Sequence, residues 1–394
     1  MPEPTGGTLL ARSLVGRDAE LDELQRALEG GSTARIVTSA AGVGKTRLVR
    51  ELGSWALAQG AVVLAGRCSP TGRATPLRPW REALLAAARG GRSPGTELQA
   101  FTPALARLVP EWGEPGADGA TLVLGEAALR VLSSWTRPGV GALLVIEDLQ
   151  WADAESLAVL EYVVDNLAEA PVLVVATLRD GEPGPGADLA AALVDRRAAT
   201  AMPLGPLTDD EVLAVARSCL ADGDLPAGAG AALVERCDGV PFLVEELLAT
   251  AVRSGWDTIG DGVPGSVAAS VATRLADLPP PARPLLTAAA LLGRHFDWTL
   301  AASAAGVSEE DAPGLLRLAV QAQLVDVEGA GFRFRHSLTR DAVAGGALPT
   351  EQATLAGRAL DALSSAEPGL PGERCTLAAQ LADVAGQRER AAAL

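Results

Sequence analysis

Lys45, the only lysine of this 394-residue chain, stands in a short segment that contains two glycines and ends in Lys-Thr-Arg. The segment is Ser39-Ala40-Ala41-Gly42-Val43-Gly44-Lys45-Thr46-Arg47, and all other Lys/Arg positions are arginines. It follows the pattern GxxxxGK[ST], in which successive backbone N–H groups at the start of a helix surround phosphate oxygens. A compact ammonium enters such a loop, whereas the broad fork of an arginine does not. The spacing therefore predicts a site for a nucleoside polyphosphate.

Each position of this loop has an expected role. Lys45 should reach the β- and γ-phosphates, and the Thr46 hydroxyl should bind Mg²⁺. The residues expected to contact the nucleotide here are Ala41, Gly42, Val43, Gly44, Lys45, Thr46 and Arg47. Ser39 replaces the first glycine of the pattern, so we expect the loop to open slightly differently. The alternative is a strand–helix turn that matches by chance, and the strand before it and the helix after it argue against that.

Two adjacent carboxylates, Glu147 and Asp148, end an apolar segment about a hundred residues later. Ligands of parallel sheets bind beyond the carboxyl ends of the strands, and paired acids there can hold Mg²⁺ and polarise a water. We expect Thr46, Glu147 and Asp148 to form the metal site. The order of the acids places Asp148 where the catalytic carboxylate is expected, with a shorter reach than a glutamate. Hydrolysis should therefore be slow, which suits a switch better than a motor. A solvated strand end is the alternative.

The elements that must position these side chains follow from the apolar pattern. Four short apolar segments indicate strands, at residues 35–38, 61–65, 142–146 and 171–177. Apolar positions 48, 49, 52, 55 and 56 have the spacing of a helix after the loop. Strands that alternate with helices indicate a parallel sheet covered on both faces. The fold class is therefore an α/β P-loop NTPase with an AAA+-like sheet, over residues 1–205.

The rest of the chain predicts three helical parts. Residues 206–262 form a helical lid, with a capping box at Thr208 and Glu211 and a linker at 260–265. Residues 263–345 combine helices with a hairpin at 324–327 and 332–335, which indicates a winged-helix domain. Residues 346–394 form an α-helical segment that could start TPR-like repeats.

Composition limits the partners. The net charge is −16, which disfavours general binding to nucleic acid or anionic membranes. Residues 263–343 carry seven arginines against eight acids, so the winged helix has no basic face by charge count. The four scattered cysteines suggest reduced thiols. Residues 1–12 lack a long apolar core, so we expect no signal peptide, and the longest apolar runs are far shorter than a bilayer span. We expect a soluble cytoplasmic protein without a membrane partner.

Ordered motifs along the chain resemble the STAND class of signalling ATPases. They are residues 14–21, the phosphate loop, residues 147–153, 204–207, 239–242 and 334–338. The best match is the N-terminal part of the large ATP-binding LuxR-type (LAL) transcriptional regulators. The resemblance implies a nucleotide-binding domain, a lid, a winged helix and helical repeats. It also implies that DNA is read only through a C-terminal domain absent from this chain.

The resemblance assigns roles to further residues. Val15, Gly16 and Arg17 should lie near the adenine. Pro241 should meet the base or sugar, although a proline is also common in the first turn of a helix. His336 should contact the ADP phosphates, or else pack against the lid.

Arg179 should sense the γ-phosphate, and a solvated arginine is the alternative. The expected catalytic residues are therefore Glu147, Asp148 and Arg179, with ATP/ADP and Mg²⁺ as cofactors.

Three functions fit the sequence. The favoured hypothesis is a slow ATPase that acts as a signalling switch. ADP would keep the domains closed, and ATP with an unknown inducer or partner protein would open them and permit homo-oligomers. The alternatives are an ATPase that works continuously in remodelling or DNA loading, and a nucleotide-binding scaffold that does not hydrolyse.

Overall fold

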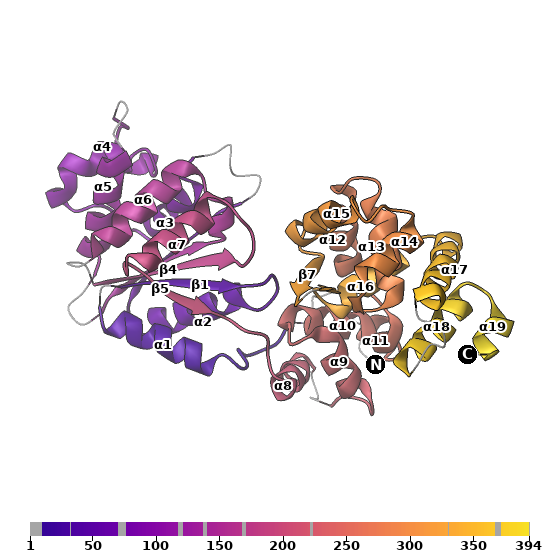
Figure 1. The fold of residues 1–394 in the computed structure, drawn as a ribbon. Helices are drawn as coiled ribbons and strands as arrows, with labels where there is room; N and C mark the ends of the chain where they lie inside the picture. The colour runs from indigo at the N-terminus through magenta and orange to yellow at the C-terminus, as the bar shows by residue number, and fades with distance from the viewer. Residues whose placement is uncertain are drawn as a thin grey trace. The chain divides into compact units, whose positions relative to one another are not determined.

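The computed structural model describes residues 10–31, 33–69, 76–116, 121–136, 140–167, 171–220, 224–329, 331–366 and 372–393. The chain divides into two units, Arg12–Thr208 and Asp209–Leu394 together with Met1–Ala11 (Figure 1). This division lies near the boundary expected at residue 205. The three parts expected after that boundary all fall in the second unit, and their separation into domains stays a prediction.

A five-stranded parallel sheet forms the centre of the first unit. Its spatial order is β2-β3-β4-β1-β5. The strands are β1 (Thr33–Ser39), β2 (Val62–Arg67), β3 (Ala142–Glu147), β4 (Val172–Arg179) and β5 (Thr200–Pro203). The four strands expected from the sequence are present. The edge strand β5 was not predicted, because only Met202 in it is buried and its apolar pattern is therefore weak.

Helices cover both faces of this sheet (Figure 1). They are α1 (Asp18–Glu29) and α2 (Lys45–Ala58) on one face, and α3 (Arg78–Arg89), α5 (Thr121–Ser134), α6 (Ala154–Asp165) and α7 (Pro185–Asp195) on the other. Each face of the sheet has its own hydrophobic core, and the strand β3 contributes side chains to both. Leu143 and Val145 pack with α1 and α2, whereas Leu144 and Ile146 pack on the opposite side. A strand buried on both faces is continuously apolar, as the sequence indicated.

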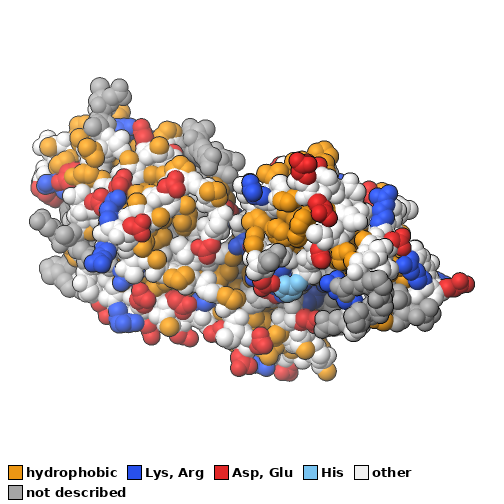
Figure 2. All heavy atoms as spheres, in the orientation of Figure 1, with side chains coloured by type: hydrophobic (Ala, Val, Ile, Leu, Met, Phe, Trp, Pro, Cys, Tyr) orange, Lys and Arg blue, Asp and Glu red, His pale blue; other side chains and the backbone are white. Residues whose placement is uncertain are grey.

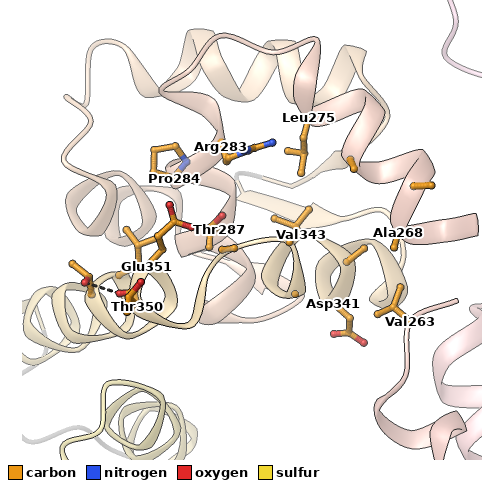
Figure 3. A pocket seen from close by; sticks show the side chains of 18 residues that line it. Val263, Ala268, Leu275, Arg283, Pro284, Thr287, Asp341, Val343, Thr350 and Glu351 are labelled. Carbon is orange, nitrogen blue, oxygen red and sulfur yellow. Dashed lines mark hydrogen bonds between the residues drawn. The ribbon is translucent and has the colours of Figure 1, made fainter. Parts of the chain in front are cut away.

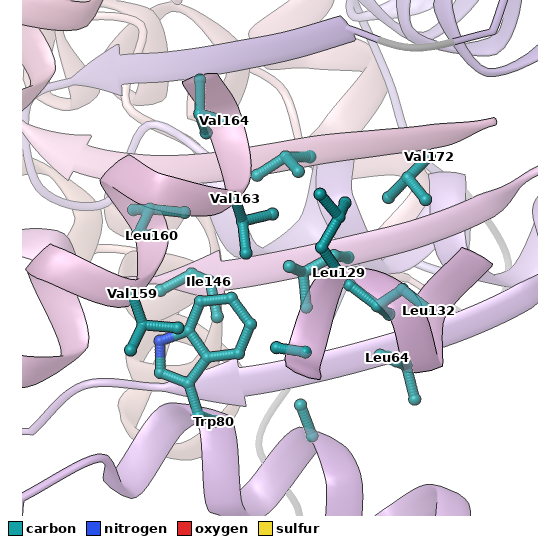
Figure 4. Packing of buried hydrophobic residues seen from close by; sticks show 14 of the residues in the cluster. Leu64, Trp80, Leu129, Leu132, Ile146, Val159, Leu160, Val163, Val164 and Val172 are labelled. Carbon is teal, nitrogen blue, oxygen red and sulfur yellow. The ribbon is translucent and has the colours of Figure 1, made fainter. Parts of the chain in front are cut away.

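The hydrophobic core on the face of the sheet covered by α3, α5, α6 and α7 fixes the ends of β2 and β3. Figure 4 shows Trp80 of α3 among Ile146, Val159 and Leu160, and the Trp80 indole N–H donates to Ser156 O at 3.2 Å. A Cβ on Gly66 would lie 1.8 Å from Pro79 O, so only glycine lets β2 run this close to the start of α3. The residue that follows, Arg67, is thereby held at the carboxyl end of the sheet.

The second unit is mainly helical. Its helices are α8 (Asp209–Cys219), α9 (Ala229–Cys237), α10 (Pro241–Ser254), α11 (Thr258–Asp261), α12 (Gly265–Ala276), α13 (Ala282–Leu292), α14 (Trp298–Ala305), α15 (Ala312–Gln321), α16 (Ser337–Gly345), α17 (Pro349–Ala366), α18 (Glu373–Val384) and α19 (Arg388–Ala393). The short helix α11 reaches into the segment expected as a linker.

The expected hairpin is present in the second unit as β7 (Val325–Glu328) and β8 (Gly331–Phe334). A third strand, β6 (His295–Phe296), pairs antiparallel with β8. The sequence did not indicate β6, because two residues are too few for an alternating pattern. The winged-helix assignment itself stays a prediction.

The surface and the thiols agree with the composition. On the face shown in Figure 2, acidic and basic side chains are interspersed over the described residues. The four cysteines form no disulfide with one another, and burial raises the pKa of Cys68 and of Cys237 to about 12. None of the helices that the structure describes is both long and apolar enough to cross a membrane.

Candidate functional site

The loop between β1 and α2 leads directly into the N-terminus of α2. Gly42 and Gly44 have φ of 81° and 113°, a left-handed backbone that favours glycine. Apart from its two chain neighbours, no described residue lies within 4 Å of the position that a Gly44 Cβ would take, so the space beside the loop is open there. Gly44 is the N-cap of α2 and, as a glycine, offers no side-chain cap to this terminus. The first N–H groups of α2 are therefore available to an anion.

The residues around these glycines divide by exposure. Ala41 and Gly42 are exposed, whereas the Val43 side chain is buried in the core beneath the sheet. Only the backbone of Val43 can therefore contribute to ligand binding. Arg47 is half-buried in the first turn of α2.

Lys45 is bound by its own loop. Its Nζ donates to Ser39 O and Ser39 Oγ, both at 2.9 Å, and to Ala40 O at 3.1 Å. Burial, followed by the charge of Arg179, lowers the pKa of Lys45 to about 8. A polyphosphate in the same place would offer stronger, charged acceptors.

Ser39 takes its place without backbone strain. It ends β1, pairs with Arg179 of β4, and is not among the residues with positive φ. The expectation that a serine here alters the opening of the loop has no support in its backbone angles. The replacement instead gives Lys45 a hydroxyl partner.

Thr46 and Glu147 meet at the head of the loop. The Thr46 hydroxyl donates to Glu147 Oε2 at 2.6 Å, across the ends of α2 and β3. Among the residues that the structure describes, no group of three or more His, Cys, Asp or Glu could hold a metal ion. A Mg²⁺ ion at Thr46 and Glu147 would therefore take its other ligands from phosphate and water, as it commonly does.

Asp148 is held by three side chains that the sequence analysis did not single out. Its Oδ2 accepts from Arg67 Nε at 2.8 Å, and its Oδ1 from Gln150 Nε2 at 3.3 Å. Its backbone N–H donates to Thr177 Oγ1 at 2.9 Å. Its φ of 62° lies in the left-handed region, which is uncommon for an aspartate and is fixed by these contacts.

Arg67 could have been found by the reasoning that found Glu147. Both residues end neighbouring strands of one parallel sheet, and the register pairs them directly. Gln150 and Thr177 carry no comparable signal, because their roles depend on how the strand ends turn.

Arg179 ends β4 at the same edge of the sheet. Its guanidinium lies 4.7 Å from the Trp151 ring centroid, and its Nη1 is 3.3 Å from Glu182 Oε1. Its backbone N–H donates to Gln150 Oε1 at 3.3 Å. Gln150 thus links the backbone of Arg179 to the carboxylate of Asp148. The loop lysine and the three expected catalytic residues, Glu147, Asp148 and Arg179, therefore share one edge of the sheet.

The N-terminal motif is tied to the end of the same unit. Gly16 has φ of 67°, and Val15 beside it is half-buried. Arg17 is buried; its Nη1 lies 3.2 Å from Glu20 Oε1 and its Nη2 donates to Gly205 O. The motif that the resemblance places near the adenine is therefore joined to the 204–207 motif, while its contact with a nucleotide stays a prediction.

Pro241 and His336 belong to the second unit. Pro241 is the first residue of α10, and His336 is the N-cap of α16. Asp238 lies between these turns, with its Oδ2 3.5 Å from His336 Nδ1 and its Oδ1 2.6 Å from Arg294 Nη1. Burial raises the pKa of Asp238, but His336 and Arg294 lower it more, so its pKa lies below the usual value. The proposed ADP contact of His336 stays a prediction.

Comparisons with known proteins agree with the geometry of the first unit. Residues 13–175 match the family model described as "AAA ATPase domain". An uncharacterized protein of Rhizobium meliloti (strain 1021) is 28% identical over 225 residues, 50% of this chain and 21% of that protein. The chain thus spans about a fifth of the length of this curated relative.

Two solved structures share the fold. The Walker-type ATPase paby2304 of Pyrococcus abyssi has a TM-score of 0.55 at 12% identity, covering 84% of this chain and 96% of that chain. The ORC2 protein of Aeropyrum pernix, solved as ADPNP–ADP complexes, has a TM-score of 0.52 at 14% identity, covering 90% and 96%. At such identities the likeness shows the fold alone. The first unit is a parallel-sheet α/β domain of the P-loop ATPase kind.

Proposed function

We propose that the chain binds ATP and ADP with Mg²⁺ and acts as a slow ATPase switch within a LuxR-type transcriptional regulator. The observation that carries nucleotide binding is the uncapped N-terminus of α2, which presents Lys45 beside the Thr46–Glu147 pair. Backbone amides, one ammonium and a hydroxyl–carboxylate pair are the donor set that a polyphosphate and Mg²⁺ require.

The roles follow from the positions of the side chains. Lys45 exchanges its bonds to Ser39 and Ala40 for phosphate oxygens. Thr46 and Glu147 bind the Mg²⁺ ion, which neutralises charge on the phosphates. Arg179, at the end of β4, faces the position of the γ-phosphate. Asp148 is the base that orients the attacking water once its carboxylate leaves Arg67.

The contacts of Asp148 support slow turnover. Both of its carboxylate oxygens accept hydrogen bonds from protein side chains, one of them from a guanidinium. A carboxylate bound in this way cannot accept a proton from water until it is released. The same observation favours a second candidate, a nucleotide-binding scaffold that does not hydrolyse.

Switching requires that the nucleotide make different contacts in two states of the protein. Pro241 and His336 of the second unit are the candidate contacts that ADP gains in a closed state. Asp238 holds both turns together, so a change at one turn reaches the other. ATP together with an inducer would open the units and permit oligomers, and a C-terminal DNA reader would give the response.

The first experiment is to measure the nucleotide that copurifies with the protein and its release. We expect close to one ADP per chain, retained through gel filtration. Lys45→Ala should lose it, with an affinity for ADP and ATP reduced by about a hundredfold or more. Arg50→Ala removes an exposed positive charge from the same helix and is the matched control, with no expected effect.

Unchanged affinity in Lys45→Ala would contradict nucleotide binding at this loop. Binding of ATP without any hydrolysis, also with Arg67 replaced, would select the scaffold instead of the switch. Steady turnover at about 1–100 s⁻¹ would contradict the switch and favour a continuously working ATPase.

A further inference from the structure

A cavity of about 850 Å³ lies within the second unit, among α12, α13, α16 and α17 (Figure 3). All 18 lining residues belong to this unit, so the cavity does not depend on the phosphate loop or on any strand of the first unit. Its size is that of sites for small organic molecules, which are about 300–1,000 Å³ and often lie between helices.

The walls are aliphatic and built from small side chains. Alanine, valine, leucine and proline supply ten of the 18 lining residues, and two more are glycines. No aromatic, histidine or cysteine side chain lines it. A flat aromatic ligand would find no ring to stack on, and a metal ion would find no nitrogen or sulfur donor. The lining suits an aliphatic body.

Thr287 supplies a buried polar group at this wall. It is 2% exposed and lines the cavity, so a polar group of a ligand that lies against this wall can pair with its hydroxyl. The Thr354 hydroxyl at the edge of the cavity donates to Thr350 O at 2.8 Å.

The charged lining residues disfavour an ionic ligand. Asp341 is paired with Arg236 at 2.7 Å and with Arg340 at 2.6 Å. Glu351 Oε2 accepts from Leu348 N at 2.8 Å, which caps the start of α17. Arg283 is exposed to solvent. A carboxylate ligand would face two acids and only the solvated Arg283, and an ammonium ligand would lose hydration to acids that already have hydrogen-bond partners.

We propose that this cavity binds an uncharged, mainly aliphatic small molecule with one or two hydroxyl or carbonyl groups. The aliphatic body contacts the alanines of α12, the valine of α16 and the two glycines at the C-terminal end of α16, and the polar group pairs with the Thr287 hydroxyl. The ligand therefore sits against α16, the helix that carries Asp341.

Asp341 connects the cavity to another part of the second unit. Arg236, at the end of α9, bonds Asp341 of α16 and also the carbonyl oxygens of Ile259 and Gly260. Arg236 precedes the turn of Asp238 and Pro241 by a few residues. A ligand that displaces α16 therefore acts on that turn. This step rests on the proposed function, in which the turn contacts the nucleotide.

The test is binding of 1-octanol to the whole chain, followed by saturation-transfer NMR and compared with octanoate and octylammonium. We expect saturable binding of octanol, with each charged analogue weaker by at least about tenfold. Ala272→Phe fills the mouth of the cavity and should abolish binding. Ala276→Phe, one turn later on α12, adds the same ring at an exposed position that does not line the cavity, and should bind as the wild type.

Thr287→Val should weaken octanol at least about threefold, because it removes the hydroxyl and keeps the shape. Octanol binding that persists in Ala272→Phe, or an octanoate affinity equal to that of octanol, would overturn the proposal. Lys45→Ala should bind octanol normally, so failure of nucleotide binding and failure of this cavity are separately visible. A rate of ADP release that octanol leaves unchanged would refute the action on the turn of Asp238 and Pro241.

Discussion

Arg67 and Asp148 form an ion pair across neighbouring strand ends, with Arg67 Nε and Nη2 each 2.8 Å from Asp148 Oδ2. The Asp148 side chain is 8% exposed, whereas Arg67 is about half exposed at 53%. Arg67 therefore shields the Asp148 carboxylate from water. Because Arg67 is itself half exposed, it has room to move away from that carboxylate. The pair sits beside the Thr46–Glu147 contact and separates the two adjacent acids into different environments.

Replacing Arg67 by alanine should release Asp148. We expect the rate of ATP hydrolysis to rise by up to about tenfold, because general-base catalysis requires a carboxylate that can accept a proton. The KM for ATP should change little, since Arg67 does not contact Lys45 or Thr46. Phosphate release under saturating ATP measures this. A fall in kcat to the level of Asp148→Asn would mean that Arg67 positions the base and does not restrain it.

Substitutions of Glu147 and of Asp148 should affect different steps, namely nucleotide binding and hydrolysis. Glu147→Gln should weaken the Mg²⁺-dependent part of ATP binding by about 10–100-fold, as expected for a metal ligand. Asp148→Asn should keep the affinity and lower hydrolysis by about 100-fold. Titrations with and without Mg²⁺, together with single-turnover rates, distinguish them. If both variants lose Mg²⁺-dependent affinity equally, Asp148 is a metal ligand as well, as the sequence suggested.

Nucleotide affinity should depend on pH through Lys45. Its pKa is about 8 when its partners are the carbonyls and hydroxyl of its own loop, and phosphate anions would raise it. Binding therefore takes up a proton only above pH 8, where the ammonium has begun to lose its charge. The dissociation constant of ADP should be level below pH 8 and rise up to about tenfold per pH unit above it.

Lys45→Arg is the control for this titration, because a guanidinium keeps its charge over the same range. Its affinity should be weaker than that of the wild type but level between pH 8 and 9.5. A level curve in the wild type would show that Lys45 is not the titrating group.

His336 should control the release of ADP. If it contacts the ADP phosphates in a closed state, His336→Ala should speed dissociation by about tenfold, the loss of one charged hydrogen bond. His295→Ala is the matched control. That histidine is 63% exposed and contacts Glu328 at 2.9 Å on the surface. Stopped-flow displacement of a fluorescent ADP measures both rates, and equal rates would leave His336 with a packing role only.

Much of the first unit could be predicted because burial on both faces makes its central strands continuously apolar. Residues 142–146 illustrate this, since five consecutive apolar residues followed by two acids are typical of a central strand that ends at the edge of a parallel sheet. The edge strand β5 was missed because three of its four residues are exposed. The strand β6, which pairs with β8, was missed for a related reason: its two residues do not establish a period.

The site could be predicted as far as its chemistry is local in the chain. Lys45, Thr46 and Glu147 stand at fixed offsets from a strand or helix end, and the sheet brings them together. Gln150 and Thr177 could not be identified in this way, because their partner Asp148 has a left-handed backbone that no apolar pattern indicates. Arg67 lies between these cases: its strand was predicted, but its register with β3 was needed to pair it with the acids.

The hydroxyl of Ser39 has a consequence for ligand choice. Ser39 and Ala40 supply three acceptors, which equals the number of N–H donors on the Lys45 ammonium. A ligand that displaces Ser39 and Ala40 from Lys45 therefore gains only the difference in free energy between its own hydrogen bonds to the ammonium and the bonds that are lost. AMP has one phosphate group, which would bind the backbone amides of α2. It would have no second phosphate to replace the hydrogen bonds that Lys45 makes to its own loop. The loop should therefore discriminate by the number of linked phosphates, with AMP excluded and ADP and ATP retained.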